Sequence, residues 1–315
     1  MNHAPALWCT GPEQVEIRDG AMGEGVLVET IYSAVSRGTE RLVYRAQVPE
    51  SEYERMRCPA QEGDFPFPVK YGYCAVGRVE EGAMAGRHVF ALHPHQRRFR
   101  QDEGALTPLP PGLPPQRAVL AANMETALNL LWDSGAAAGD RIAIVGAGLV
   151  GALVGYLASR LPGTEVTLVD VQGSRAALAE GLGCGFALPG SVPGDCDVVL
   201  HLSATAEGLA TAIDTAGVEA TIVEGSWYGS GTTPAPLGGA FHSRRLRLLS
   251  SQVGSLPPRH GPRWTHARRR AKALELLCDP VLDRLFSGES AFETLPERYG
   301  EILGDPGTLC HRIRY

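Results

Sequence analysis

Residues 141–161 read RIAIVGAGLVGALVGYLASRL, and the fold class is predicted chiefly from this stretch. Its first five residues have strand composition. Three glycines, Gly146, Gly148 and Gly151, follow in the pattern G-x-G-x-x-G, and the chain continues beyond them as an expected apolar helix. Glycine accounts for 38 of the 315 residues, so the three glycines alone are a weak signal. The flanking strand and helix, with Asp170 at the end of the next predicted strand, make the signal specific. We therefore predict a strand–turn–helix unit that binds a dinucleotide.

The residues of this unit have separate expected roles. Gly146 allows the tight turn, Gly148 lets the backbone approach the pyrophosphate, and Gly151 lets helix and strand pack closely. The helix N-terminus offers N–H groups and a positive dipole end to the phosphates. Asp170 would accept hydrogen bonds from the ribose hydroxyls and repel a 2′-phosphate, so NAD is the expected cofactor and NADP the less favoured one. The other expected cofactor contacts are Thr126, Leu149, Val150, Arg175 and Ser203.

Outward from this unit the chain continues as alternating strands and helices. Alternation of this kind predicts the α/β class with a doubly wound parallel sheet, as in Rossmann domains. The strands are expected at 141–145, 166–169, 198–200 and 220–223, and the helices at 149–161 and 174–182. The first third is β-rich instead, with strands expected at 26–32, 75–80 and 88–92 and a short polar helix at 51–57.

A proline-dense passage around residue 112 is the expected seam between two domains. We predict a β-rich domain at 1–117 and a dinucleotide-binding domain at 118–255. After residue 255 a helix at 268–277 and a strand at 310–315 remain, and residues 256–315 are expected to return to the first domain.

Composition excludes several classes of partner. The net charge is -6, and the basic run at 268–272 reads as the solvated face of a helix, so we expect no nucleic-acid partner. The longest apolar stretch, 143–158, is too short to span a bilayer comfortably, and no signal peptide is visible at the N-terminus. The seven cysteines form no Cys-x-x-Cys pair, which favours the reducing cytoplasm.

Four segments resemble the medium-chain dehydrogenase/reductase superfamily, whose best-known members are zinc alcohol dehydrogenases. They are SRGTE at 36–40, GYCAVGRV at 72–79, GRHV at 86–89 and META at 124–127. The SRGTE form is most similar to the bacteriochlorophyllide dehydrogenase branch. The resemblance implies a GroES-like catalytic domain and a Rossmann domain. It also implies a homodimer that pairs edge strands, which 219–225 and 246–249 would supply; a monomeric mass in light scattering would contradict this.

The zinc ligands of the family have no counterparts in this sequence. The positions that correspond to them hold Arg37, Tyr73 and Ala122, which are an implausible set for zinc. The cysteine lobe for structural zinc would follow Pro94, yet no cysteine occurs between positions 74 and 184. A lone His-x-His at 93–95 lacks a third ligand, so we expect no metal.

The leading functional hypothesis is hydride transfer between a nicotinamide cofactor and a small alcohol or carbonyl substrate. Reduction of an activated C=C bond, as in zinc-free quinone and enoyl reductases, is a second hypothesis, and a non-catalytic dinucleotide-binding protein is a third.

Without zinc, side chains must polarise the carbonyl and exchange the proton. We expect Tyr73 as oxyanion donor, Thr39 as proton relay and His93 as general acid/base, with its pKa near neutrality. Glu40 or Glu125 would orient the set. The alternative is that Tyr73 fills the metal cavity and His93 is a pocket-wall residue.

Overall fold

The computed structural model of the protein describes residues 2–315, which form two compact units. The first unit comprises residues 2–122 and 270–315, and the second comprises residues 123–269. Each unit has its own sheets and its own apolar core.

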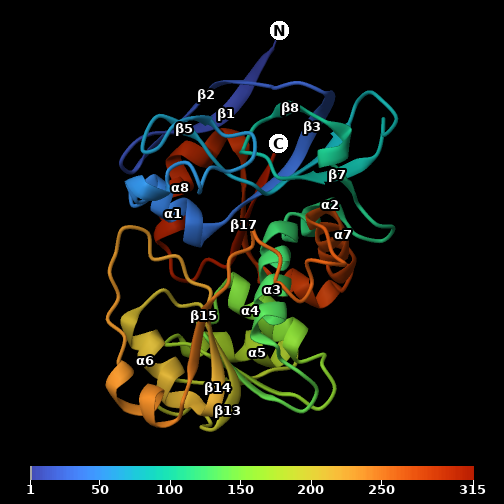
Figure 1. Ribbon diagram of the computed structural model, residues 1–315. Helices are drawn as coiled ribbons and strands as arrows, with labels where there is room; N and C mark the ends of the chain where they lie inside the picture. Colours follow the sequence, from blue (N-terminus) through green and yellow to red (C-terminus); the bar gives the residue numbers. More distant parts are fainter. Residues whose placement is uncertain (1) are drawn as a thin grey trace. The chain divides into compact units, whose positions relative to one another are not determined.

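The second unit is built on one parallel sheet of six strands in the order β12-β11-β10-β13-β14-β15. Strands β13, β14 and β15 of this sheet are labelled in Figure 1. The sequence order reverses between β10 and β13, as in dinucleotide-binding folds. The strands are β10 (Arg141–Val145), β11 (Glu165–Val169), β12 (Gly185–Ala187), β13 (Cys196–His201), β14 (Ala216–Glu224) and β15 (Arg247–Ser250). All five strand pairs are parallel, which confirms the predicted α/β class and doubly wound sheet.

Helices cover this sheet and bury its apolar side chains. The helices that pack on its strands are α4 (Leu149–Ala158), α5 (Ala176–Leu182) and α6 (Ala206–Thr215). The unit also contains most of α3 (Ala121–Ser134), which begins in the first unit, and the start of α7 (His266–Leu276). One core cluster joins α6 to β10, β13 and β14 through Val145, Val199, Leu209, Ile213 and Ile222. A sheet covered by helices on both faces needs strands that are apolar along nearly their whole length. Such strands are easy to recognise in the sequence, which explains why the alternation of strands and helices was predictable.

The first unit contains two mixed or antiparallel sheets. The smaller has the order β2-β1-β5-β4, and the larger has the order β16-β17-β3-β6-β7-β9, with β8 paired to β3. The strands are β1 (His3–Gly11), β2 (Gln14–Ala21), β3 (Val26–Val35), β4 (Glu62–Gly63), β5 (Val69–Lys70), β6 (Ala75–Val79), β7 (His88–Ala91), β8 (Arg98–Gln101), β9 (Thr107–Pro108), β16 (Phe286–Ala291) and β17 (Cys310–Arg314). The expected strands at 26–32, 75–80 and 88–92 are thus confirmed as β3, β6 and β7.

Three α-helices accompany these sheets: α1 (Arg37–Tyr44), α2 (Pro115–Ala118) and α8 (Leu295–Gly304). Tyr44 of α1 packs edge-on against Tyr299 of α8, with ring centroids 5.4 Å apart. The expected helix at 51–57 is wrong, because the chain makes only a 3-10 turn at Glu50–Glu52 followed by further turns. This stretch has no apolar stripe that a helix would bury.

The unit boundaries differ from the expected ones at 117 and 255, because both fall inside helices, α3 and α7. The proline-dense passage lies within the first unit. Residues 251–269 stay with the second unit because they pack on α3: His260 stacks on Trp132 at 4.3 Å, and Arg269 bonds Glu125 and Asn129. The second unit therefore extends to residue 269, and the return to the first unit begins later than expected.

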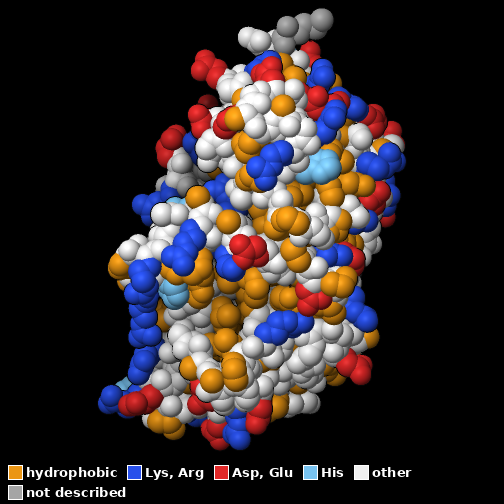
Figure 2. Space-filling view, turned by 90° about the vertical axis from the view of Figure 1, so that its right-hand side faces the viewer, with side chains coloured by type: hydrophobic (Ala, Val, Ile, Leu, Met, Phe, Trp, Pro, Cys, Tyr) orange, Lys and Arg blue, Asp and Glu red, His pale blue; other side chains and the backbone are white. Residues whose placement is uncertain are grey.

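Two surface expectations also change. The segment 219–225 is not an edge strand, because β15 pairs with β14 and itself forms the end of the sheet. The basic run at 268–272 is not wholly solvated, since Arg269 is only 3 % exposed. On the face shown in Figure 2, acidic and basic side chains are interspersed over most of the surface. Within residues 2–315, no helix is both long enough and apolar enough to cross a bilayer.

Candidate functional site

The glycine turn of the second unit has the geometry that dinucleotide binding requires. Gly146 has φ +108°, and a Cβ there would lie 2.7 Å from the backbone of Leu202. A Cβ on Gly151 would lie 2.0 Å from the carbonyl oxygen of Gly146, so helix α4 can approach β10 only with glycine at this position. A Cβ on Gly148 would meet no heavy atom within 4 Å. The chain is therefore tightly packed at the first and third glycines and open at the second.

The start of α4 is available to an anion. Gly148 is the N-cap residue, no side chain caps the helix, and Gly148 is exposed while Leu149 and Val150 are partly exposed. The first N–H groups of a helix have no partner within the helix, and together with the helix dipole they favour a phosphate. These features fit the pyrophosphate of a dinucleotide, as the sequence predicts.

Asp170 is held at the carboxyl end of β11, next to the glycine turn. One carboxylate oxygen accepts a hydrogen bond from the backbone N–H of Ala147 at 2.8 Å, and the other accepts from the backbone N–H of Gln172 at 2.9 Å. A carboxylate has about four acceptor sites, so both oxygens keep capacity for ribose hydroxyls. Arg175 lies one turn further on in a 3-10 helix (Gly173–Arg175) and is buried.

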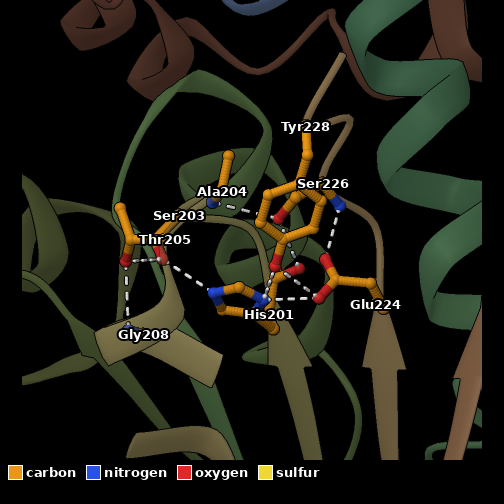
Figure 3. A network of polar contacts seen from close by, with 8 residues as sticks. All are labelled: His201, Ser203, Ala204, Thr205, Gly208, Glu224, Ser226 and Tyr228. Carbon is orange, nitrogen blue, oxygen red and sulfur yellow. Dashed lines mark hydrogen bonds and ion pairs between the residues drawn. The ribbon is translucent and has the colours of Figure 1, made fainter. Parts of the chain in front are cut away.

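Four further residues lie at the carboxyl ends of the next two strands, and sequence reasoning missed three of them (Figure 3). His201 ends β13 and Glu224 ends β14, and their parallel register places them opposite each other. Nδ1 of His201 lies 2.6 Å from Oε2 of Glu224, and Nε2 lies 2.7 Å from Oγ of Ser203. The Tyr228 hydroxyl donates to the same Glu224 oxygen at 3.0 Å. Only Ser203 was among the predicted residues. The overlooked signal is that two apolar strands each end on a titratable residue.

In the first unit, Tyr73, Thr39 and Glu40 come together at the start of α1. The Tyr73 hydroxyl donates to Oγ of Ser36 at 2.5 Å. Burial, reinforced by the neighbouring Cys74 thiol, raises the pKa of Tyr73, although hydrogen bonds with Ser36 and Thr39 act in the opposite direction. Tyr73 is therefore a neutral phenol at physiological pH and can serve as a hydrogen-bond donor.

Glu40 holds the backbone at the start of α1, next to Tyr73 and Thr39. Its side chain is buried, and Oε1 accepts from the backbone N–H of Ser36 at 2.7 Å. Oε2 accepts from the Tyr299 hydroxyl at 2.5 Å and lies 3.0 Å from Nε2 of His95. Glu40 thus holds Ser36, which in turn accepts from Tyr73, so the orienting role predicted for Glu40 has a structural route.

The pKa expected for His93 is wrong. Its ring is 2 % exposed and stacks on Phe99 with centroids 3.9 Å apart. Burial lowers the pKa of His93 to about 3, which outweighs the hydrogen bond to the Pro94 carbonyl. A group with this pKa is neutral at pH 7 and is poorly matched to proton exchange there. The geometry favours the other expectation, a wall residue.

Glu125 and Thr126 lie on the part of α3 that belongs to the second unit. Oε1 of Glu125 is 3.1 Å from Nε of Arg269, and both side chains are almost fully buried. Thr126 is partly buried. The structure gives Glu125 an ion pair within its own unit, which is a structural role.

The residues at the zinc positions of the family do not fit a zinc ion. Arg37 carries a permanent positive charge, Ala122 has no donor atom, and the raised pKa of Tyr73 works against a phenolate ligand. The two histidines of the 93–95 segment diverge, since His93 stacks on Phe99 and His95 bonds Glu40. Across the described residues 2–315, no three His, Cys, Asp or Glu side chains are grouped so that they could hold a metal ion.

Comparison with known proteins gives relatives of low identity that extend over nearly the whole chain. No model of a protein family matches the sequence. D-guloside 3-dehydrogenase of Escherichia coli K12 is 23% identical, and the alignment covers 92% of each chain. A zinc-binding dehydrogenase of Sinorhizobium meliloti 1021 bound to NADP is 18% identical, with a TM-score of 0.77 and 100% of both chains covered. A short chain alcohol dehydrogenase of Escherichia coli CFT073 in complex with NADH is 14% identical, with a TM-score of 0.80 and 100% of both chains covered. The chain therefore has the fold of these dehydrogenases, with a Rossmann unit and a β-rich GroES-like unit.

Proposed function

We propose that the protein is an oxidoreductase that transfers a hydride between a nicotinamide dinucleotide and an alcohol or carbonyl substrate, without zinc. The glycine turn carries this proposal. The backbone leaves no room for a Cβ at Gly146 or Gly151, whereas no protein atom lies near the Cβ position of Gly148, at a helix N-terminus that no side chain caps. Gly148, Leu149 and Val150 would hold the pyrophosphate. The bound dinucleotide would supply or accept the hydride.

In the first unit, Ser36 would reverse its hydrogen bond and donate to the Tyr73 oxygen, which frees the single hydroxyl hydrogen of Tyr73 for the substrate oxygen, where it would stabilise developing negative charge. Thr39 and Ser36 would pass the proton, because both hydroxyls interact with the Tyr73 phenol. Glu40 is a positioning residue, since it holds the Ser36 backbone. His93 takes no part in proton exchange in this proposal, because burial lowers its pKa to about 3.

The substrate class we propose is a secondary alcohol of a sugar or polyol. D-guloside 3-dehydrogenase, the relative that covers 92% of this chain, supports this choice. The experiment is a screen of sugars, polyols, simple ketones, enones and quinones with NAD(H) and NADP(H), read as change in absorbance of the reduced cofactor. Turnover confined to enones or quinones would replace this proposal with C=C reduction. Tight dinucleotide binding without any turnover would leave a binding protein.

We expect NAD(H) to bind more tightly than NADP(H), because the Asp170 carboxylate repels a 2′-phosphate. The Asp170→Ala variant should narrow the preference by about tenfold, since it removes one charge repulsion and the ribose hydrogen bonds. Titration of both cofactors against both proteins measures this. Equal affinities in the unmodified protein would contradict the assignment, whatever the variant does.

Purified protein should contain well under one zinc per chain, and chelators should leave turnover unchanged. The physical reason is that a guanidinium, a neutral phenol and a methyl group occupy the ligand positions. Elemental analysis and a chelator titration check both statements. Stoichiometric zinc whose removal abolishes turnover would show that other residues form a metal site.

A further inference from the structure

The carboxyl ends of β13 and β14 carry a connected set of polar side chains whose centre is a carboxylate (Figure 3). Oε2 of Glu224 lies 2.6 Å from Nδ1 of His201 and accepts from the Tyr228 hydroxyl at 3.0 Å. Oε1 accepts from the backbone N–H of Ser226 at 2.8 Å. Three groups, one from the end of β13 and two from the loop after β14, therefore hold one carboxylate in a fixed place.

Helix α6 packs on the Ser203 end of the network, and the Glu224 end is partly exposed. A Cβ on Gly208, in the first turn of α6, would lie 2.0 Å from Oγ of Ser203 and 2.7 Å from Nε2 of His201. The helix thus packs directly on the serine end, which is a poor place for a nucleophile. His201 is fully buried, whereas the Glu224 side chain is 18% exposed. Ser203 is also partly exposed, but α6 packs on it, so the carboxylate is the charged group of the network that a ligand over the strand ends can reach.

The carboxylate is charged. Burial alone raises the pKa of Glu224, but the His201 ring and the hydrogen bonds from Ser226 outweigh burial and hold the pKa below its ordinary value. Burial and the neighbouring Glu224 charge raise the pKa of the Tyr228 phenol, so this hydroxyl stays protonated and donates. Glu224 therefore carries a carboxylate charge of its own, beside the His201 ring, at the ends of β13 and β14.

The position of this charge relative to the dinucleotide follows from the sheet order. A dinucleotide lies across the carboxyl edge at the point where the strand order reverses, one nucleotide over each half. Asp170 ends the strand β11, in the half that would take the adenosine ribose. Glu224 and His201 end strands of the other half, which would take the nicotinamide nucleotide.

We infer that Glu224 is a specificity-determining residue that favours the oxidised cofactor, because its carboxylate faces the half of the sheet edge where the positively charged nicotinamide ring would lie. This inference rests on the proposed function. The reduced ring is neutral and gains nothing from the carboxylate. His201, Tyr228 and Ser226 are positioning groups that keep the carboxylate in place.

The test compares equilibrium affinities for the oxidised and reduced forms of the cofactor. Glu224→Gln keeps the shape of the side chain and removes its charge. We expect the ratio of Kd for NAD⁺ to Kd for NADH to rise about fivefold, as for loss of one charge at several ångströms in a partly solvated site. The change should come from weaker NAD⁺ binding, with NADH affinity nearly constant.

Two control variants separate charge from structure. Asp197→Asn removes a carboxylate from the opposite end of β13, where it accepts from the Arg141 backbone N–H, and should leave the ratio unchanged. Tyr228→Phe removes a hydrogen-bond donor but keeps the Glu224 charge, so the affinities for NAD⁺ and NADH should change by the same factor. If Glu224→Gln does not fold, the double variant Glu224→Gln/His201→Gln pairs two amides, leaves no unpartnered imidazole, and should show the same rise.

The outcomes distinguish this inference from the proposed function. If the unmodified protein binds neither NAD(H) nor NADP(H), the proposed function fails. If it binds the cofactor and the folded charge-removal variant keeps the original ratio, the role of Glu224 is overturned and the cofactor site stands.

Discussion

Replacing Gly148 with valine should lower the affinity for the dinucleotide by about a hundredfold while the protein remains folded. The backbone at Gly148 has φ -73° and ψ -171°, an extended conformation that valine adopts readily. Its Cβ would meet no protein atom within 4 Å, so the only space it fills is the approach of the pyrophosphate. Losing two charge-assisted hydrogen bonds of about 1.5 kcal/mol each accounts for the expected factor.

Thermal unfolding and cofactor titration together check this result. Gly194→Val is the matched control, because a Cβ at Gly194 also meets nothing within 4 Å and the residue lies before β13, at the opposite edge of the sheet. Both variants should unfold within a few degrees of the unmodified protein, and only Gly148→Val should lose affinity. Unchanged affinity in Gly148→Val would remove the pyrophosphate from this turn.

Replacing Tyr73 with phenylalanine should lower kcat by about a hundredfold and leave cofactor affinity intact, as expected for loss of one oxyanion donor. The phenol is held by Ser36 at 2.5 Å and stays protonated because burial raises its pKa. In the proposed zinc-free site, this donor would act alone on the reacting oxygen. Steady-state kinetics on a substrate from the proposed screen measure the effect.

The neighbouring Tyr71 provides a matched control for the lost hydroxyl. Tyr71 is buried and packs edge-on against Tyr73, with ring centroids 6.2 Å apart. Tyr71→Phe should keep kcat within about threefold, and so should His93→Gln, since neither group is placed to exchange a proton at neutral pH. Equal turnover in Tyr73→Phe and Tyr71→Phe would show that another donor polarises the substrate.

Sequence reasoning succeeded where consecutive residues determine the local fold. The turn at 146–151, its strand and its helix are contiguous, so the glycine pattern records the conformation directly, and Gly146 has the positive φ that this pattern implies. The parallel sheet was predictable for the same reason, since buried parallel strands are apolar along their length. The short helix expected at 51–57 failed because composition alone was its only support.

The tertiary structure alone decided which titratable groups meet. His201 and Glu224 are separated by 23 positions and are joined by the register of two parallel strands, which no local pattern encodes. Burial against Phe99 lowered the pKa of His93 to about 3, a change that depends on packing from a different strand. The order of the residues alone was enough to predict the glycine turn and the parallel sheet that carries it. The charges that tune the site follow from solvent exclusion and strand register, which exist only after the chain has folded.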